Sequence, residues 1–181
     1  MRITGGTLGR RDITVPKGIR PTQDKVRAAI FSSLAAEVPG ARVLDLFAGS
    51  GALGLEAWSR GASFVCWVES DRRVLNTLKE NVGGLCTEAG GRTEIRQADA
   101  LGFLRKGWTG EPFDLILADP PYEQTCLPEL LLALEQGGIL ASGGLLVFEQ
   151  GASEEPARRP GWVLLKDKTY GDTRVLVYKR A

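Results

Sequence analysis

Four consecutive residues, Asp119-Pro120-Pro121-Tyr122, combine a carboxylate, two prolines and an aromatic ring directly after the apolar run 113–118. The prolines fix the backbone φ angle and carry no N–H, so the carbonyl oxygens of Asp119 and Pro120 can point at a ligand. An exocyclic amine on a flat base needs hydrogen-bond acceptors, a rigid backbone and a stacking face, and this tetrapeptide offers all three. The alternative interpretation is a proline-rich loop that only ends a strand.

A glycine-rich loop earlier in the chain, Gly49-Ser50-Gly51-Ala52-Leu53-Gly54, has the spacing G-x-G-x-x-G, and Glu69 follows where a ribose-binding acid is expected. This pattern is typical of NAD sites, which hold a pyrophosphate at a helix N-terminus. Asp45, at the end of the preceding apolar run, would repel a pyrophosphate but attract an ammonium group. S-adenosylmethionine carries adenosine at one end and an ammonium at the other, so it is the predicted cofactor.

Acidic residues lie at or just past the carboxyl ends of four expected strands, namely Asp45, Glu69, Asp99 and Asp119. Ligands of open α/β sheets bind beyond the carboxyl ends of the strands, where these acids would meet. Glu69 could accept from both ribose hydroxyls, and Asp99 from the adenine amino group. Simpler interpretations stay open: Asp45 could bond neighbouring backbone N–H groups, Asp99 could cap a helix, and Glu69 could be an ordinary strand-end acid.

The elements that must position these groups alternate between strands and helices. We expect strands at 43–47, 64–69, 92–97, 113–119, 144–149, 162–167 and 174–178, most of which are short runs rich in apolar residues. Helical spacing predicts helices at 21–34, with Thr22 as N-cap, and at 53–60, 71–81, 99–105 and 127–136. The alternation predicts an α/β fold with a doubly wound, mostly parallel seven-stranded sheet that ends in a C-terminal antiparallel hairpin. Residues 2–15 predict a small N-terminal β-hairpin.

Composition removes several kinds of chemistry. The 181-residue chain has no histidine, which excludes Ser-His-Asp triads, imidazole acid–base catalysis and most zinc sites. Its three cysteines, Cys66, Cys86 and Cys126, are widely spaced and suit a reducing cytosol. The chain lacks an apolar run of membrane-spanning length and a signal-peptide core, so we expect a cytoplasmic protein with no metal and no membrane contact.

Positive charge is concentrated near the N-terminus. Residues 1–27 contain seven Lys or Arg and two Asp, a net charge of +5, although the whole chain carries only +1. Such a segment suggests a patch that binds a partner with phosphates, and the alternative is a solvated arm. The expected RNA-binding residues are Arg2, Arg10, Arg11, Arg20 and Arg27. Arg20, Thr22 and Arg27 could instead reach the methionine end of the cofactor.

Two segments, VLDLFAGSGALGLEA (43–57) and ADPPY (118–122), resemble the cofactor loop and catalytic motif of class I S-adenosylmethionine-dependent methyltransferases. More narrowly, MRITGGTLGRR, RPTQDKVRAAIFSSL (20–34) and KTYGDTRVLVY (168–178) make the chain similar to the RsmD family over nearly its whole length. That family methylates the 2-amino group of a guanine in small-subunit rRNA. Departures are minor: Ala28-Ala29 replace a frequent acidic residue, and Ser32-Ser33 a frequent asparagine.

The resemblance implies a Rossmann-like methyltransferase domain at 21–181 behind a basic β-hairpin extension at 1–20. It implies catalytic roles for Asp119, Pro120, Pro121 and Tyr122. Implied cofactor contacts are Asp45, Phe47, Gly49, Ser50, Gly51, Glu69, Asp99 and Ala100. The expected partner is 16S rRNA, within a small ribosomal subunit or an assembly intermediate, and we expect a monomer. Alternatives are an adenine-N6 methyltransferase acting on RNA or DNA and a non-catalytic RNA-binding assembly module.

Overall fold

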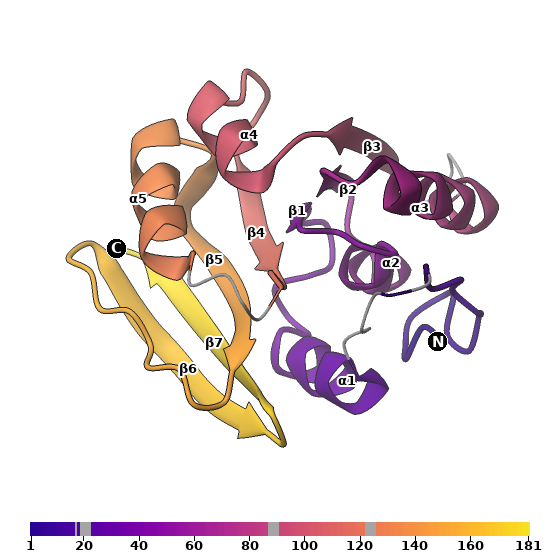
Figure 1. The fold of residues 1–181 in the computed structure, drawn as a ribbon, viewed down its shortest axis with the longest axis horizontal. Helices are drawn as coiled ribbons and strands as arrows, with labels where there is room; N and C mark the ends of the chain where they lie inside the picture. The colour runs from indigo at the N-terminus through magenta and orange to yellow at the C-terminus, as the bar shows by residue number, and fades with distance from the viewer. Residues whose placement is uncertain (17, 19–22, 87–90, 122–125) are drawn as a thin grey trace.

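The computed structural model describes residues 1–16, 18, 23–86, 91–121 and 126–181 (Figure 1). Its helices are α1 (Asp24–Ser33), α2 (Ala52–Ser59), α3 (Arg72–Leu85), α4 (Ala100–Lys106) and α5 (Leu127–Gly137). Its strands are β1 (Arg42–Leu46), β2 (Phe64–Glu69), β3 (Arg92–Gln97), β4 (Phe113–Ala118), β5 (Leu140–Gly151), β6 (Trp162–Tyr170) and β7 (Thr173–Arg180).

The strands form one seven-stranded sheet in the order β3-β2-β1-β4-β5-β7-β6. The first five strands pair in parallel, whereas β7 lies antiparallel between β5 and β6. The chain runs from β1 outward to β2 and β3 on one side and then returns to β4 on the other side of β1. The connections that follow β1 and β4 therefore lead away from each other, which leaves a crevice at the carboxyl edge of the sheet. The predicted doubly wound, mostly parallel sheet with a C-terminal antiparallel hairpin is confirmed.

Helices cover both faces of this sheet. The core on one face includes residues of α1, α2 and α3, and the core on the other includes residues of α4 and α5 (Figure 1). Neighbouring residues of the central strands alternate between these cores: Leu117 of β4 belongs to the first and Ala118 to the second. This alternation, which follows from the two-residue period of a strand, decides which acids face α1, α2 and α3.

The N-terminal segment is less regular than the predicted hairpin. Its antiparallel pairing is a single isolated bridge between Arg2 and Asp12. Ile3 and Ile13 are buried in the same core as α1, α2 and α3, and the backbone N–H of Leu8 donates to Ser59 Oγ at 2.8 Å. The segment is therefore bonded to α2, and the division into an extension at 1–20 and a domain at 21–181 stays a prediction.

Helix starts show where local sequence signals hold. Asp71 caps α3 by accepting from the Arg73 N–H at 2.7 Å, which is a typical N-cap interaction of aspartate. The first helix differs: it begins at Asp24, and Gln23 occupies the N-cap without a side-chain bond. The prediction of Thr22 as N-cap is therefore wrong, and Thr22 itself lies outside the described residues. None of the described helices has the length and apolar character needed to cross a bilayer.

Candidate active site

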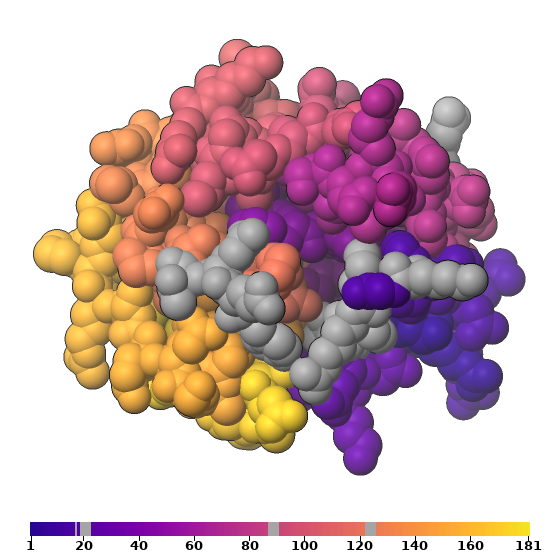
Figure 2. Space-filling view, viewed as in Figure 1, coloured from indigo at the N-terminus to yellow at the C-terminus, as the bar shows by residue number. Residues whose placement is uncertain are grey.

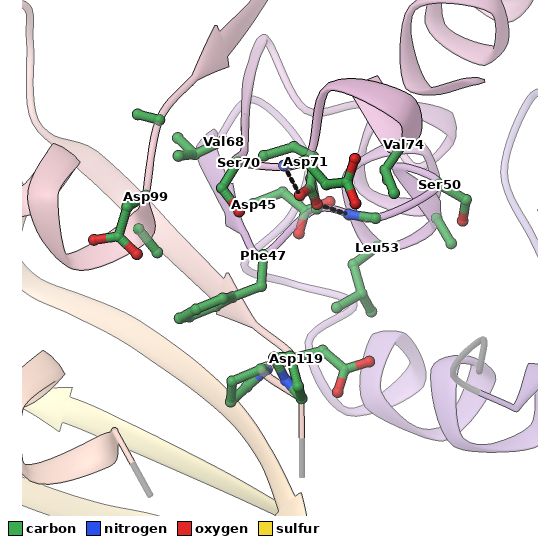
Figure 3. Close-up of a pocket in the computed structure, with 18 of the residues that line it drawn as sticks. Asp45, Phe47, Ser50, Leu53, Val68, Ser70, Asp71, Val74, Asp99 and Asp119 are labelled. Atoms are coloured by element: carbon green, nitrogen blue, oxygen red, sulfur yellow. Dashed lines mark hydrogen bonds between the residues drawn. The ribbon is translucent and has the colours of Figure 1, made fainter. Parts of the chain in front are cut away.

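A cavity of about 580 Å³ lies at the carboxyl edge of the sheet, at the crevice beside β1 (Figure 3). Predicted site residues from four separate strand ends line it: Asp45, Phe47, Gly49, Ser50, Glu69, Asp99, Ala100, Asp119, Pro120 and Pro121. Gly51 is not among the lining residues. Tyr122 lies outside the described residues. The structure thus brings the two predicted motifs together, and the roles of the individual residues stay predictions.

Asp45 is the most deeply buried of these acids, with 1% of its surface exposed. Its Oδ2 accepts a hydrogen bond from the Gly54 N–H at 2.8 Å, so the simpler interpretation of Asp45 as a backbone partner holds alongside its place in the cavity. Burial raises the pKa of Asp45 well above its usual range, the Gly54 bond opposes this, and the negative charges of Asp119 and Glu69 add to it. A cationic group bound beside Asp45 would stabilise its ionised form and so lower its pKa.

Gly54 is a glycine because the helix lies against β2 at this point. A Cβ at this position would lie 2.2 Å from Trp67 Nε1 and 3.0 Å from Asp45 Oδ2. The third glycine of the loop therefore permits close packing of α2 on the sheet. This packing places the Gly54 N–H where it can donate to the Asp45 carboxylate.

Replacing Gly54 with alanine should destabilise the protein by about 1–3 kcal/mol, because the new methyl group forces Trp67 and Asp45 to move. It should also weaken cofactor binding, since Asp45 loses its position. Urea unfolding and calorimetry measure the two effects. Gly83→Ala is the matched control, because nothing lies within 4 Å of a Cβ in that part of α3. Equal stability of the two variants would contradict the packing role of Gly54.

Glu69 joins the glycine loop to the start of α3. Its Oε2 accepts from the Gly49 N–H and its Oε1 from the Asp71 N–H, each at 2.8 Å (Figure 3). A carboxylate oxygen has two acceptor positions, so each oxygen keeps one for a further donor. That arrangement suits a pair of ribose hydroxyls, and it holds the loop in shape at the same time.

Asp99 caps α4 and lines the cavity. Its Oδ2 accepts from the Gly102 N–H at 2.8 Å, which is the capping role left open by the sequence. Ala100, the first residue of α4, lines the cavity beside it. Capping fixes the Asp99 carboxyl at the mouth of the cavity, so the structural and ligand-binding interpretations are compatible.

Phe47 has a left-handed backbone, with φ of 58°. A side chain in this region costs roughly 1–2 kcal/mol, which the surrounding fold must offset. The result is that the Phe47 ring extends into the space between Asp99 and Asp119 (Figure 3). No pattern in the sequence signals this conformation, because phenylalanine normally avoids it.

Arg27 does not lie on the surface. It is 0% exposed, and its guanidinium donates to Glu56 Oε2 at 3.2 Å and to Asp24 Oδ1 at 2.9 Å, with the Arg2 carbonyl as another acceptor. This burial contradicts the prediction of Arg27 as an RNA-binding residue. The sequence could not reveal it, because Glu56 lies on another helix.

The remaining predicted RNA contacts differ in status. Arg2, Arg10 and Arg11 are exposed. They belong to the N-terminal segment, which is drawn in indigo at one side of the molecule in Figure 2. They stay predictions. Arg20 lies outside the described residues.

Sequence reasoning assigned no role to two positions near Asp119, of which one lines the cavity and the other is buried on β5. Thr173, the first residue of β7, lines the cavity together with Asp119. Glu149 ends the apolar part of β5 and is 2% exposed. The sequence shows an acid at the end of an apolar run in the case of Glu149. It gives no signal for Thr173, because Thr173 reaches the cavity only when β7 runs antiparallel to β5 and starts at the carboxyl edge.

Comparison with solved structures identifies the architecture. The rRNA methyltransferase aviRa from Streptomyces viridochromogenes matches with a TM-score of 0.74 at 17% identity, over 92% of this chain and 88% of that one. At that identity the likeness concerns the fold alone. The strand order and the cavity at the carboxyl edge accordingly define this protein as having a Rossmann-like methyltransferase fold.

Closer relatives narrow the assignment to one family. A family profile described as "Conserved hypothetical protein 95" matches residues 1–179. Ribosomal RNA small subunit methyltransferase D from Escherichia coli (strain K12) is 37% identical over 183 residues, covering 99% of this chain and 90% of the relative. The solved structure of yhhF from Escherichia coli has a TM-score of 0.87 at 37% identity, over 99% and 97% of the two chains. The chain belongs to the family that this profile describes, and the resemblance to the RsmD family is confirmed.

Proposed function

We propose that this protein transfers a methyl group from S-adenosylmethionine to the exocyclic 2-amino group of a guanine in 16S rRNA. The observation that carries this proposal is the shared cavity: Asp119 and Pro120 line the same space as Asp45 and Glu69. The name of the Escherichia coli relative supports ribosomal RNA of the small subunit as the substrate.

The residues of the cavity fit S-adenosylmethionine. Asp45 supplies buried negative charge for the ammonium end, and Glu69 keeps acceptor positions for the ribose. Asp99 would accept from the adenine amino group, near the Phe47 ring. The cofactor, when bound, supplies a methyl group already activated by the positive sulfur.

Asp119 and the Pro120 carbonyl would orient the target amine. The lone pair of a purine amine is delocalised into the ring, so the amine is a weak nucleophile. Acceptors that hold both N–H groups draw the nitrogen toward a pyramidal geometry and stabilise the positive charge that develops on it. Alignment at attack distance is then the main contribution of the protein. Tyr122 is proposed as the stacking partner of the base.

The target guanine must be unpaired or turned out of its helix to enter the cavity. Exposed Arg2, Arg10 and Arg11 would hold the surrounding phosphates, which makes binding sensitive to salt. We further propose that the enzyme acts in the cytoplasm as a monomer, on a small subunit or an assembly intermediate.

The decisive experiment is methyl transfer from a tritiated donor to small subunits purified from a strain that lacks its own family member. Label should appear at one guanine, as N2-methylguanine after nucleoside digestion. Label on adenine N6 would replace the proposal with the adenine-specific alternative. Binding of RNA without any transfer would favour the non-catalytic assembly module.

Glu69→Ala should weaken binding of S-adenosylmethionine about 10- to 100-fold, because each hydrogen bond to a charged group contributes roughly 1.5–3 kcal/mol. Calorimetric titration measures this directly. Glu80→Ala on the exposed side of α3 is the matched control and should bind normally. Unchanged affinity in Glu69→Ala would remove the ribose role.

A further inference from the structure

Glu149 is a buried carboxyl group at the catalytic end of the sheet to which neither motif assigns a role. It lies on β5 and is 2% exposed. Its Oε1 is buried and has no hydrogen-bond partner among the residues that the structure describes. A buried polar atom without a partner costs about 1–3 kcal/mol, so a function is the natural reason for keeping it.

Strand register makes Glu149 the neighbour of Asp119. β4 and β5 pair in parallel, and Ala118, the last residue of β4, lies opposite Phe148. The next residues along the chain are Asp119, directly after β4, and Glu149 of β5. Leu117 and Val147, which lie two residues before Asp119 and Glu149, also pair with each other and both face the core beneath α1, α2 and α3. By the two-residue period, Asp119 and Glu149 extend to the same face of the sheet.

The charges around Glu149 oppose its ionisation. Burial raises its pKa well above the usual range, and the negative charge of Asp119 on the neighbouring strand raises it further. Arg27 of α1 lowers the pKa, and Asp45 of β1 raises it. The Arg27 guanidinium is already engaged by Glu56 and Asp24, so it is shared among several carboxylates.

We propose that Glu149 is a positioning residue that holds a proton at neutral pH and so keeps Asp119 as the charged member of a carboxyl pair. When one buried and one half-buried carboxyl group lie side by side, a single negative charge on the pair costs less free energy than two. The more buried group, Glu149, keeps the proton, and Asp119, which lines the cavity, keeps the charge. The consequence for catalysis rests on the proposed function.

The reaction balances without a dedicated base. The new N–CH₃ bond forms as the S–CH₃ bond breaks, and the sulfonium becomes a neutral thioether. The positive charge then lies on the amine, which loses a proton to Asp119 or to water. Ionised Asp119 can accept that proton, and neutral Glu149 prevents a second charge that would distort the acceptor geometry.

The first test is the proton itself, measured on the protein without RNA. At pH 7, the infrared difference between the wild type and Glu149→Gln should show a protonated carboxyl band, whereas the difference between the wild type and the exposed control Glu80→Gln should not. Absence of that band from the Glu149→Gln difference would overturn the proposal. Because this readout needs no methyl transfer, it stands or falls independently of the proposed function.

A second readout is stability against pH. A group whose folded-state pKa is raised stabilises the fold fully below its unfolded pKa, and that contribution is lost as pH rises through the folded value. Wild-type stability should therefore fall with rising pH above the usual range of a glutamate. The fall should be smaller in Glu149→Gln, and an identical fall in both proteins would contradict the assignment.

The third readout is the rate of methyl transfer. Glu149→Ala should lower kcat about tenfold or more with little change in the KM for the cofactor, as expected when a positioned charge is disturbed. Glu149→Gln should recover most of that loss, because its amide is neutral, and should flatten the decline of kcat at high pH. A Gln variant as slow as the Ala variant would refute the positioning role.

Discussion

Replacement of Asp119 by alanine is expected to lower the rate of methyl transfer about 100- to 1,000-fold, the usual cost of removing one group that stabilises developing charge. Binding of S-adenosylmethionine should survive, because Asp45, Glu69 and Asp99 remain on the other strand ends. Single-turnover transfer to small subunits measures the rate, and calorimetry measures the binding.

Asp114→Ala is the control for this experiment. Asp114 lies on β4, the strand that Asp119 directly follows, but it is exposed, accepts from the Arg42 N–H at 2.9 Å and is not among the residues that line the cavity. It should transfer methyl groups at the wild-type rate. Full activity in Asp119→Ala would remove the acceptor role, and loss of activity in both variants would point to a general defect of β4.

Removal of Glu56 should have the largest effect on stability. Its carboxylate is 0% exposed and accepts from the Thr4 N–H at 2.8 Å, from Arg27 Nε at 3.2 Å and from Arg60 Nε at 2.9 Å. Glu56→Ala breaks the fully buried ion pair with Arg27, although Asp24 still contacts that guanidinium, and breaking a buried pair typically costs about 3–5 kcal/mol. Urea unfolding measures the loss.

Two comparisons isolate that cause. Glu129→Ala breaks the exposed pair with Arg105 and should leave stability nearly unchanged. The double variant Arg27→Met/Glu56→Leu should be more stable than Glu56→Ala alone, because it removes the buried cation together with its buried partner. A double variant less stable than Glu56→Ala would show that packing, and not charge, dominates at this site.

The sequence predicted most where a signal is local. The bounds of β2 and β3 agree with the expected 64–69 and 92–97, because apolar or alternating runs end at clear turns. Asp71 and Asp99 cap the helices that follow them, since an N-cap depends on residues two or three positions away. The strand-end acids meet in one cavity because parallel strands share a carboxyl edge.

What the sequence could not predict depends on distant pairing. The burial of Arg27 requires Glu56 on another helix, and the neighbourhood of Asp119 and Glu149 requires the β4–β5 register. The left-handed backbone of Phe47 runs against its own preference and is imposed by the loop around it. Thr173 reaches the cavity only through the antiparallel return of β7.

The position of β7 also has a consequence for synthesis on the ribosome. β7 follows every other strand in the chain, yet it lies inside the sheet, between β5 and β6, with Val175, Leu176 and Val177 buried. Until it emerges, β5 has an unpaired edge that is exposed to misassociation, and the cavity lacks Thr173. A nascent chain therefore cannot complete its active site before its last strand is released, which separates translation of this protein from its activity.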